Sequence, residues 1–152
     1  MNPPPLLRAA RRLVDLRPEA RAFAARAWLA APGVRASLAV LGLRSTLRWV
    51  EALTKGGTPD PLAQPVAVPE GSALVGGAFR AHVVGGECLP RSVVQYLLHR
   101  RDGVPARLVV GVRRPDRGSS IEAHAWIDAG GGGHEESGFE PLFATGTYGG
   151  AT

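Results

Sequence analysis

Cys88 and His124 are the two residues whose types and placement could together perform chemistry. Cys88 is the only cysteine of the chain and follows Gly85-Gly86-Glu87 at the start of a predicted helix. The nucleophilic form of cysteine is the thiolate, and the unpaired N–H groups and macrodipole of a helix N-terminus favour negative charge. A histidine can accept the thiol proton and pass it to a leaving amine. The pair therefore predicts nucleophilic catalysis, with backbone N–H groups near Cys88 holding an oxyanion.

A helix and three strands are predicted to position this pair. Pro90 suits the first turn of the helix, and "ARLVVGVRR" at 106–114 predicts a strand. "IEAHAWIDA" at 121–129 alternates, which places His124 on the polar face of a second strand. After a glycine run that is expected to form a hairpin connection, "HEESGFEPLF" at 134–143 predicts a short third strand. The apolar face of the helix consists of Leu89, Val93, Val94, Leu97 and Leu98.

The rest of the chain divides into a helical region at 1–55, a Pro/Gly-rich connection at 56–71 and the remainder at 72–152. Together these parts are expected to form one compact α+β domain, with the helix of Cys88 packed on a small antiparallel sheet. Helices are expected at residues 6–14, 18–31, 34–52 (kinked at Gly42) and 72–82, with a break at Pro32-Gly33.

Composition limits the classes of protein that this chain can represent. Hydrophobic residues make up 45% of its 152 residues, enough for a core and too many for a disordered tail. One cysteine excludes an internal disulfide framework, and no secretory signal or membrane-spanning run is visible, so a cytoplasmic protein is expected. The formal charge of +5 would suit a nucleic acid, a membrane surface or an acidic peptide, and a membrane is not expected as a partner. No aromatic stacking platform accompanies the arginines, so nucleic acid is not expected as a partner.

Two stretches together resemble one family. "CLPRSVVQYLLHRRDGVPARLVVGVRR", which begins at Cys88, is followed by "EAHAWID", which contains His124. This order of motifs resembles the lasso-peptide B proteins, the transglutaminase-like leader peptidases of lasso-peptide biosynthesis. The resemblance covers roughly residues 72–145, and the combined motif is far more specific than any of its parts.

The resemblance implies a papain/transglutaminase-like cysteine peptidase that cuts the leader from a ribosomal precursor peptide. It implies that Cys88 is the nucleophile and His124 the base, with no cofactor and no metal. Because the chain shows no β-rich leader-recognition domain, it resembles the stand-alone members of the family. Such members work with a separate winged-helix-like recognition protein and pass the core to an ATP-dependent lasso cyclase.

The third member of the triad is less directly indicated. Asp128 shares the strand face of His124 but lies four residues away, about 13 Å along a strand, which is too far for one hydrogen bond. We therefore interpret Asp128 as a solvated or structural acid. The acid of the family lies about twelve residues beyond the histidine, which corresponds here to Glu136. A turn centred at Gly130-Gly131 would instead place Glu135 on the histidine's face, and a bulge in the glycine run would reconcile the two. We take Glu136 as the expected acid.

Five further residues are candidates for roles near the site. His82 could donate to an oxyanion, although a position on the surface is favoured. Arg91 could meet an acidic group of the substrate, although a solvated position on the surface is favoured for it as well. Ser92 is expected to support the first helical turn, and Trp126 to pack beside the histidine and shield it from water. His134 lies beside two glutamates, but a metal site is not expected from this spacing.

Two alternatives remain open. The thioester formed on Cys88 could be attacked by an amine, which would give transglutaminase-type acyl transfer in place of hydrolysis. The chain could also be a basic, non-catalytic module that binds peptide or nucleic acid, with Cys88 merely buried. That reading predicts an inert thiol and binding that weakens steeply with salt.

Overall fold

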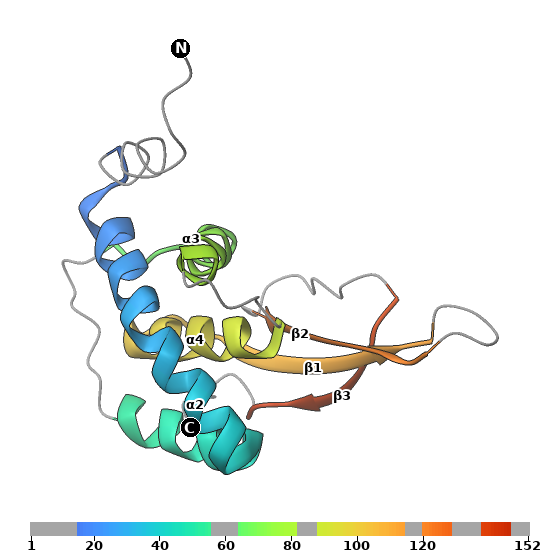
Figure 1. Ribbon diagram of the computed structural model, residues 1–152. Coiled ribbons are helices and arrows are strands. Elements are labelled where there is room, and N and C mark those ends of the chain that lie inside the picture. The colour runs from blue at the N-terminus through green and yellow to red at the C-terminus, as the bar shows by residue number, and fades with distance from the viewer. Residues whose placement is uncertain (1–14, 56–63, 82–87, 115–119, 129–137, 147–152) are drawn as a thin grey trace, which may run out of the picture.

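In the part of the chain that the structure describes, three helices pack on one side of a three-stranded antiparallel sheet (Figure 1). The computed structural model describes residues 15–55, 64–81, 88–114, 120–128 and 138–146. The predicted α+β class is confirmed, and the helix predicted at 6–14 lies outside the described residues. The elements are α2 (Pro18–Thr54), α3 (Val68–Ala81), α4 (Cys88–Arg101), β1 (Arg107–Arg113), β2 (Glu122–Asp128) and β3 (Glu140–Ala144).

The break predicted at Pro32-Gly33 is wrong, because α2 continues through both residues. A proline inside a helix lacks one donor and costs about 3 kcal/mol. Ala31 and Val34 on either side are each only 1% exposed. Burying a side chain the size of valine contributes about 1.5–3 kcal/mol, so packing of this segment offsets the cost of the proline.

The kink predicted at Gly42 is confirmed, and it divides α2 into two segments that run in different directions (Figure 1). Gly42 has φ 74° and ψ 172°, a conformation that is essentially restricted to glycine. Two hydroxyl groups hold the segments together: Thr46 Oγ1 donates to the Gly42 carbonyl at 2.9 Å and lies 2.8 Å from Ser37 Oγ. Thr46 is fully buried. These hydrogen bonds therefore hold the two segments of α2 at a defined angle at Gly42.

Two helix boundaries bear on the site. The helix beginning at Cys88 is found as predicted, whereas α3 begins at Val68 and not at Ser72. Pro69 stands in the first turn of α3, where a proline N–H is not needed, and the Gly71 N–H donates to the Ala67 carbonyl at 2.8 Å. The connection between the helical regions is therefore shorter than the sequence predicts.

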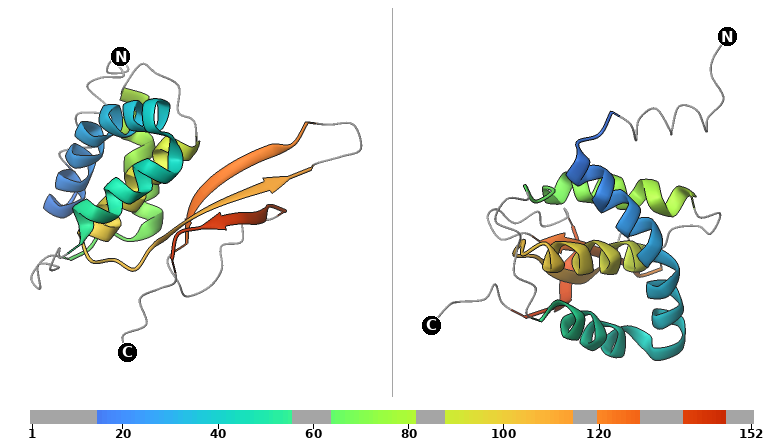
Figure 2. Two further views of the ribbon diagram at one scale, coloured as in Figure 1. Left: turned by 90° about the horizontal axis from the view of Figure 1, so that it is seen from below. Right: turned by 90° about the vertical axis from the view of Figure 1, so that its left-hand side faces the viewer.

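The sheet has the order β2-β1-β3, so β1 lies in the middle and pairs with both neighbours. The first two strands occur as predicted. The hairpin expected between the second and third strands is wrong, because β3 pairs with β1 and not with β2. The strands extend away from the helices, so one end of the sheet is not covered by them (Figure 2, left).

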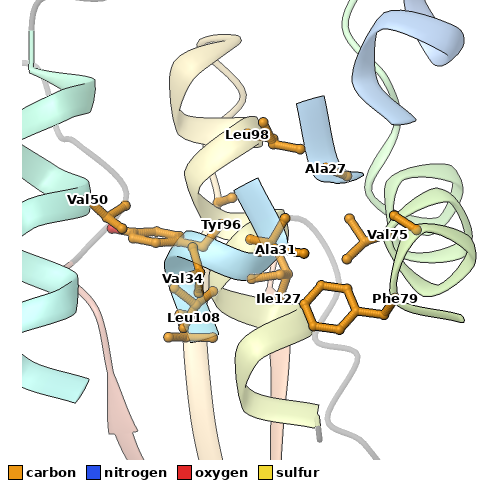
Figure 3. Packing of buried hydrophobic residues seen from close by; sticks show 14 of the residues in the cluster. Ala27, Ala31, Val34, Val50, Val75, Phe79, Tyr96, Leu98, Leu108 and Ile127 are labelled. Carbon is orange, nitrogen blue, oxygen red and sulfur yellow. The ribbon is translucent and has the colours of Figure 1, made fainter. Parts of the chain in front are cut away.

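Helix α4 lies at the centre of the packing, between α2, α3 and the sheet (Figure 2). Its sequence predicts one buried face, yet Tyr96, Gln95 and His99 are buried as well as the apolar residues. The core is continuous from helix to sheet, as Figure 3 shows. It includes Ala27, Ala31, Val34 and Val50 of α2, Val75 and Phe79 of α3, Tyr96 and Leu98 of α4, Leu108 of β1 and Ile127 of β2.

Candidate active site

Cys88 is the first residue of α4, and this end of the helix lies against the edge strand β2. Its Sγ is 3.9 Å from the carbonyl oxygen of Ala123, the residue before His124. One turn further along α4, the hydroxyl of Ser92 donates to the Ala125 carbonyl at 2.8 Å. Ser92 thus joins the helix to the strand, a role different from the predicted support of the first turn. The contact of Cys88 with Ala123 and the hydrogen bond of Ser92 with Ala125 together hold the thiol beside the strand that carries His124.

His124 lies among aromatic rings. Trp126 is nearly parallel to its imidazole, with ring centroids 6.2 Å apart, which confirms the predicted packing. Phe139, just before β3, is tilted against the imidazole at 5.4 Å and against the indole at 6.5 Å. Gly111 pairs with His124 across the sheet, and a Cβ on it would lie 2.8 Å from the indole of Trp126. A glycine in the middle strand therefore allows the indole to lie close to β1 beside the imidazole.

A pocket of about 390 Å³ opens where α3, the start of α4 and β2 meet. Cys88 and His124 both line it, so the structure brings the two predicted residues to one cavity. Concave sites with a few converging polar groups are typical places for catalysis. The remaining lining residues are Val68, Pro69, Ser72 and Val75 of α3, Arg91, Ser92 and Gln95 of α4, and Ala125, Trp126 and Ile127 of β2.

A stripe of polar side chains runs along α4 from this pocket into the core. Cys88, Ser92, Gln95 and His99 follow one another at intervals of four, three and four residues, the spacing of one helical face. Gln95 Nε2 donates to the Val68 carbonyl at 2.9 Å and lies 3.4 Å from His99 Nε2. The stripe thus fixes α4 against α3 as well as against β2.

His99 ends the stripe as a fully buried, neutral side chain. Burial lowers its pKa from 6.5 to about 4, and the nearby Asp102 opposes the shift only in part. The amide nitrogen of Gln95 can only donate, so Nε2 of His99 accepts and the proton resides on Nδ1. Among the described residues Nδ1 has no hydrogen-bond partner. A Cβ at Gly71 would lie 2.8 Å from Nε2, so α3 can approach this histidine only with a glycine there.

Of the three acids considered for the triad, only Asp128 lies among the described residues. Asp128 pairs with Arg107 at 2.8 Å, directly across the sheet, which agrees with its interpretation as a structural acid. Glu135 and Glu136 lie outside the described residues, so Glu136 stays a prediction. The argument that favoured Glu135 assumed a hairpin between the second and third strands. The pairing of β3 with β1 removes that assumption.

The other predicted residues are placed as follows. Arg91 lines the pocket, while His82 and His134 lie outside the described residues. In the described parts of the chain no three His, Cys, Asp or Glu side chains are grouped so as to hold a metal ion. No helix in those parts is both long and apolar enough to cross a membrane.

Comparison with known proteins agrees with this geometry. A family model described as the transglutaminase-like superfamily matches residues 30–143. The chain belongs to the transglutaminase-like superfamily. The match extends from α2 to β3 and so includes Cys88, His124 and the pocket between them. No curated protein and no solved structure matches the chain.

Several residues of the site were missed by sequence reasoning. Phe139, Gln95 and His99 were not candidates, because they lie in segments interpreted only by their apolar pattern. The polar stripe on α4 carried a usable signal, since four polar or thiol side chains recur at helical spacing from the predicted nucleophile. No comparable sequence signal pointed to Phe139, because its contact with His124 depends on the path of the chain between β2 and β3.

Proposed function

We propose that this protein is a cysteine peptidase that removes the leader from a lasso precursor peptide, by cutting one bond at the leader–core junction. The observation that carries the proposal is the shared pocket, lined by Cys88 at a helix N-terminus and His124 on the adjacent strand. Membership of the transglutaminase-like superfamily supports a cysteine-dependent reaction. The motifs around Cys88 and His124, which resemble the lasso-peptide B proteins, support the substrate.

The proposed reaction assigns one role to each of these groups. The thiolate of Cys88 attacks the carbonyl carbon of the scissile bond, while N–H groups at the start of α4 hold the developing oxyanion. His124 takes the thiol proton and gives it to the amine of the core peptide as the C–N bond breaks. Water, deprotonated by His124, then attacks the thioester, which releases the leader as a free acid and restores the thiol. Glu136 orients the imidazole.

Two partners belong to the proposal. A separate winged-helix-like protein presents the leader, and an ATP-dependent lasso cyclase receives the core. Both follow from the resemblance of the motifs and are tested by adding each protein to the cleavage reaction.

A mass-spectrometric cleavage assay tests the proposal. A candidate lasso precursor and its recognition protein are incubated with the wild-type protein, Cys88→Ala or His124→Ala. We expect one cut at the leader–core junction and a fall in rate of at least about 10³-fold in both variants. Arg48→Gln, which alters an exposed residue of α2 outside the lining of the pocket, is the control and should cut normally. A cut that survives in Cys88→Ala would exclude this residue as the nucleophile.

The same assay decides the third residue of the triad. Glu136→Gln is expected to slow the cut by about 10²–10⁴-fold, whereas Glu135→Gln should leave it nearly unchanged. The reverse result would assign the role to Glu135.

Acyl transfer to an amine is a second candidate function, favoured by the superfamily to which the chain belongs. It uses the same pocket and differs only in the acceptor that attacks the thioester. Adding glycinamide to the assay separates the two: a leader ligated to the amine indicates transfer, and a free acid indicates hydrolysis. A protein whose Cys88 is inert to iodoacetamide and whose precursor is bound but uncut would instead be a binding module.

A further inference from the structure

We propose that Arg91 and Arg80 form a carboxylate-binding subsite beside Cys88, and that the substrate is a peptide with an acidic side chain close to the scissile bond. The inference rests on the proposed function, since it assigns a substrate class to the same pocket. Arg91 lines that pocket together with Cys88 and His124. It follows Cys88 by three residues on α4, so the two side chains leave the helix on neighbouring positions of one face.

The two guanidinium groups converge on one spot of α3. A Cβ built on Gly76 would lie 2.6 Å from Arg91 Nη2 and 3.4 Å from Arg80 Nη1. Arg91 therefore reaches across from α4 and lies on the bare backbone of α3, where any side chain would displace it. Arg80 approaches the same point from its own helix, one turn further along. The glycine thus makes room for the guanidinium of Arg91, which lines the pocket, and for that of Arg80 beside it, which lies outside the lining.

Neither arginine is neutralised by an acid in the part of the chain that the structure describes. Four other arginines there are paired with carboxylates at 2.6–2.8 Å: Arg17, Arg26, Arg107 and Arg113. No such pair involves Arg91 or Arg80, and the described lining of the pocket contains no Asp or Glu. Two like charges held close together without a partner are ready to receive an anion.

A carboxylate suits this arrangement better than a neutral group. Guanidinium groups bind carboxylates through two parallel hydrogen bonds, which adds direction to the attraction of charge. The half-buried position of Arg91 limits screening by water and salt, whereas Arg80 is exposed and contributes less. An acidic side chain of the peptide would be held here while its neighbouring bond lies at Cys88.

Paired alkylating reagents test the subsite without the natural substrate. N-bromoacetyl-glutamic acid α-amide carries a side-chain carboxylate, and N-bromoacetyl-glutamine α-amide is its neutral counterpart. The thiolate displaces bromide from either reagent, so a C–S bond forms as the C–Br bond breaks. Because Cys88 is the only cysteine, intact mass reports its alkylation alone. The ratio of the acid rate to the amide rate is compared with the ratio for free glutathione.

We expect this ratio to exceed that of glutathione by about tenfold, as one charge-assisted contact would give. Arg91→Gln should return it to the value of glutathione, and Arg80→Gln should lower it in part. Gly76→Ala should also abolish the preference, since the methyl group would displace the Arg91 guanidinium. Gly77→Ala is the matched control, because its Cβ would meet nothing closer than 3.9 Å. Both glycine variants should be at least as stable as the wild type, as alanine favours a helix.

An equal ratio in the wild type and in Arg91→Gln or Gly76→Ala would overturn the subsite. The rate with the neutral reagent reports the nucleophile, and with it the proposed function, whereas the ratio reports only the subsite. A second pair, N-bromoacetyl-glycine and its amide, distinguishes the source of the carboxylate. Preference within the glutamate pair assigns an acidic side chain, and preference confined to the glycine pair would overturn that assignment in favour of a chain-terminal carboxylate.

Discussion

Ser92 shows how one small side chain positions the candidate nucleophile. Ser92 follows Cys88 by four residues, and Ala125 follows His124 by one. The buried hydroxyl of Ser92 donates to the Ala125 carbonyl. No other side-chain hydrogen bond in the described structure joins α4 to β2 so close to the pocket, apart from the long contact of Cys88 itself. The bond therefore sets how the first turn of α4 lies along the strand.

Ser92→Ala is expected to lower the free energy of unfolding by about 1–3 kcal/mol, because a buried carbonyl loses its donor. Urea denaturation of the wild type and the variant measures the difference. Ser72→Ala serves as the control, since Ser72 is exposed and its loss should change stability by less than about 0.5 kcal/mol. Equal effects of the two substitutions would show that the Ser92 bond does not stabilise the fold.

At the level of single residues, the sequence was sufficient to select the main site residues but not to predict most of their contacts. Cys88 and His124 could be selected because thiol and imidazole have recognisable chemistry, and Trp126 because it lies two residues from His124 on one strand face. The target of Ser92 could not be predicted, since its acceptor is a backbone carbonyl 33 residues away. Arg91 was open to two interpretations because nothing in the sequence shows that Gly76 lies beneath it.

Among the elements, α2 shows the limit of local signals most clearly. Proline and glycine at 32–33 predict a break, yet the helix continues there and turns at Gly42. Local propensity is outweighed where neighbouring residues are buried, and it prevails where the backbone needs a conformation that only glycine adopts. The strands β1 and β2 were predictable from alternation, whereas the partner of β3 depended on tertiary packing.

Two glycines of α2 should respond to alanine in opposite directions. Gly42→Ala forces a side chain into a conformation with φ 74° and should lower the free energy of unfolding by about 1–3 kcal/mol. Gly33→Ala should raise it by about 0.5–1 kcal/mol, since Gly33 is helical and a Cβ there meets nothing within 4 Å. Thermal unfolding followed by circular dichroism checks both. Destabilisation by Gly33→Ala would indicate that the helix is broken at Pro32 after all.

The whole molecule is held together at the junction of α2, α3 and α4 around His99. The Phe23 ring of α2 lies 5.2 Å from the imidazole, Gly71 of α3 leaves no room for a Cβ beside it, and Asp102 just after α4 pairs with Arg26 at 2.6 Å. All three helices therefore depend on one buried ionisable group that is neutral in the folded state. Protonation would place a charge in this junction and set an N–H of His99 against the amide N–H of Gln95.

Acid should destabilise the fold through this histidine. Its folded-state pKa of about 4 lies below the unfolded value of 6.5, so the unfolded chain binds more protons between these pH values. Stability is therefore full above about pH 6.5 and decreases as the pH falls toward 4, by about 3 kcal/mol in all. Urea denaturation at pH 7 and pH 4 measures the loss, and His99→Gln should reduce the difference by that amount. An unchanged difference in His99→Gln would assign the pH dependence to other groups.

The central position of α4 makes folding and function inseparable in this protein. The helix that begins with the candidate nucleophile is also the one that α2, α3 and the sheet enclose. Loss of the fold anywhere in the core releases the first turn of α4, so heat inactivation should follow global unfolding with no separately inactivated native form. In evolution, substitutions along the inner faces of α4 are selected for packing and for thiol placement at once. Drift should therefore be slowest on the buried faces of this helix, and changes in substrate preference should accumulate at residues that line the pocket outside the core, Arg91 among them.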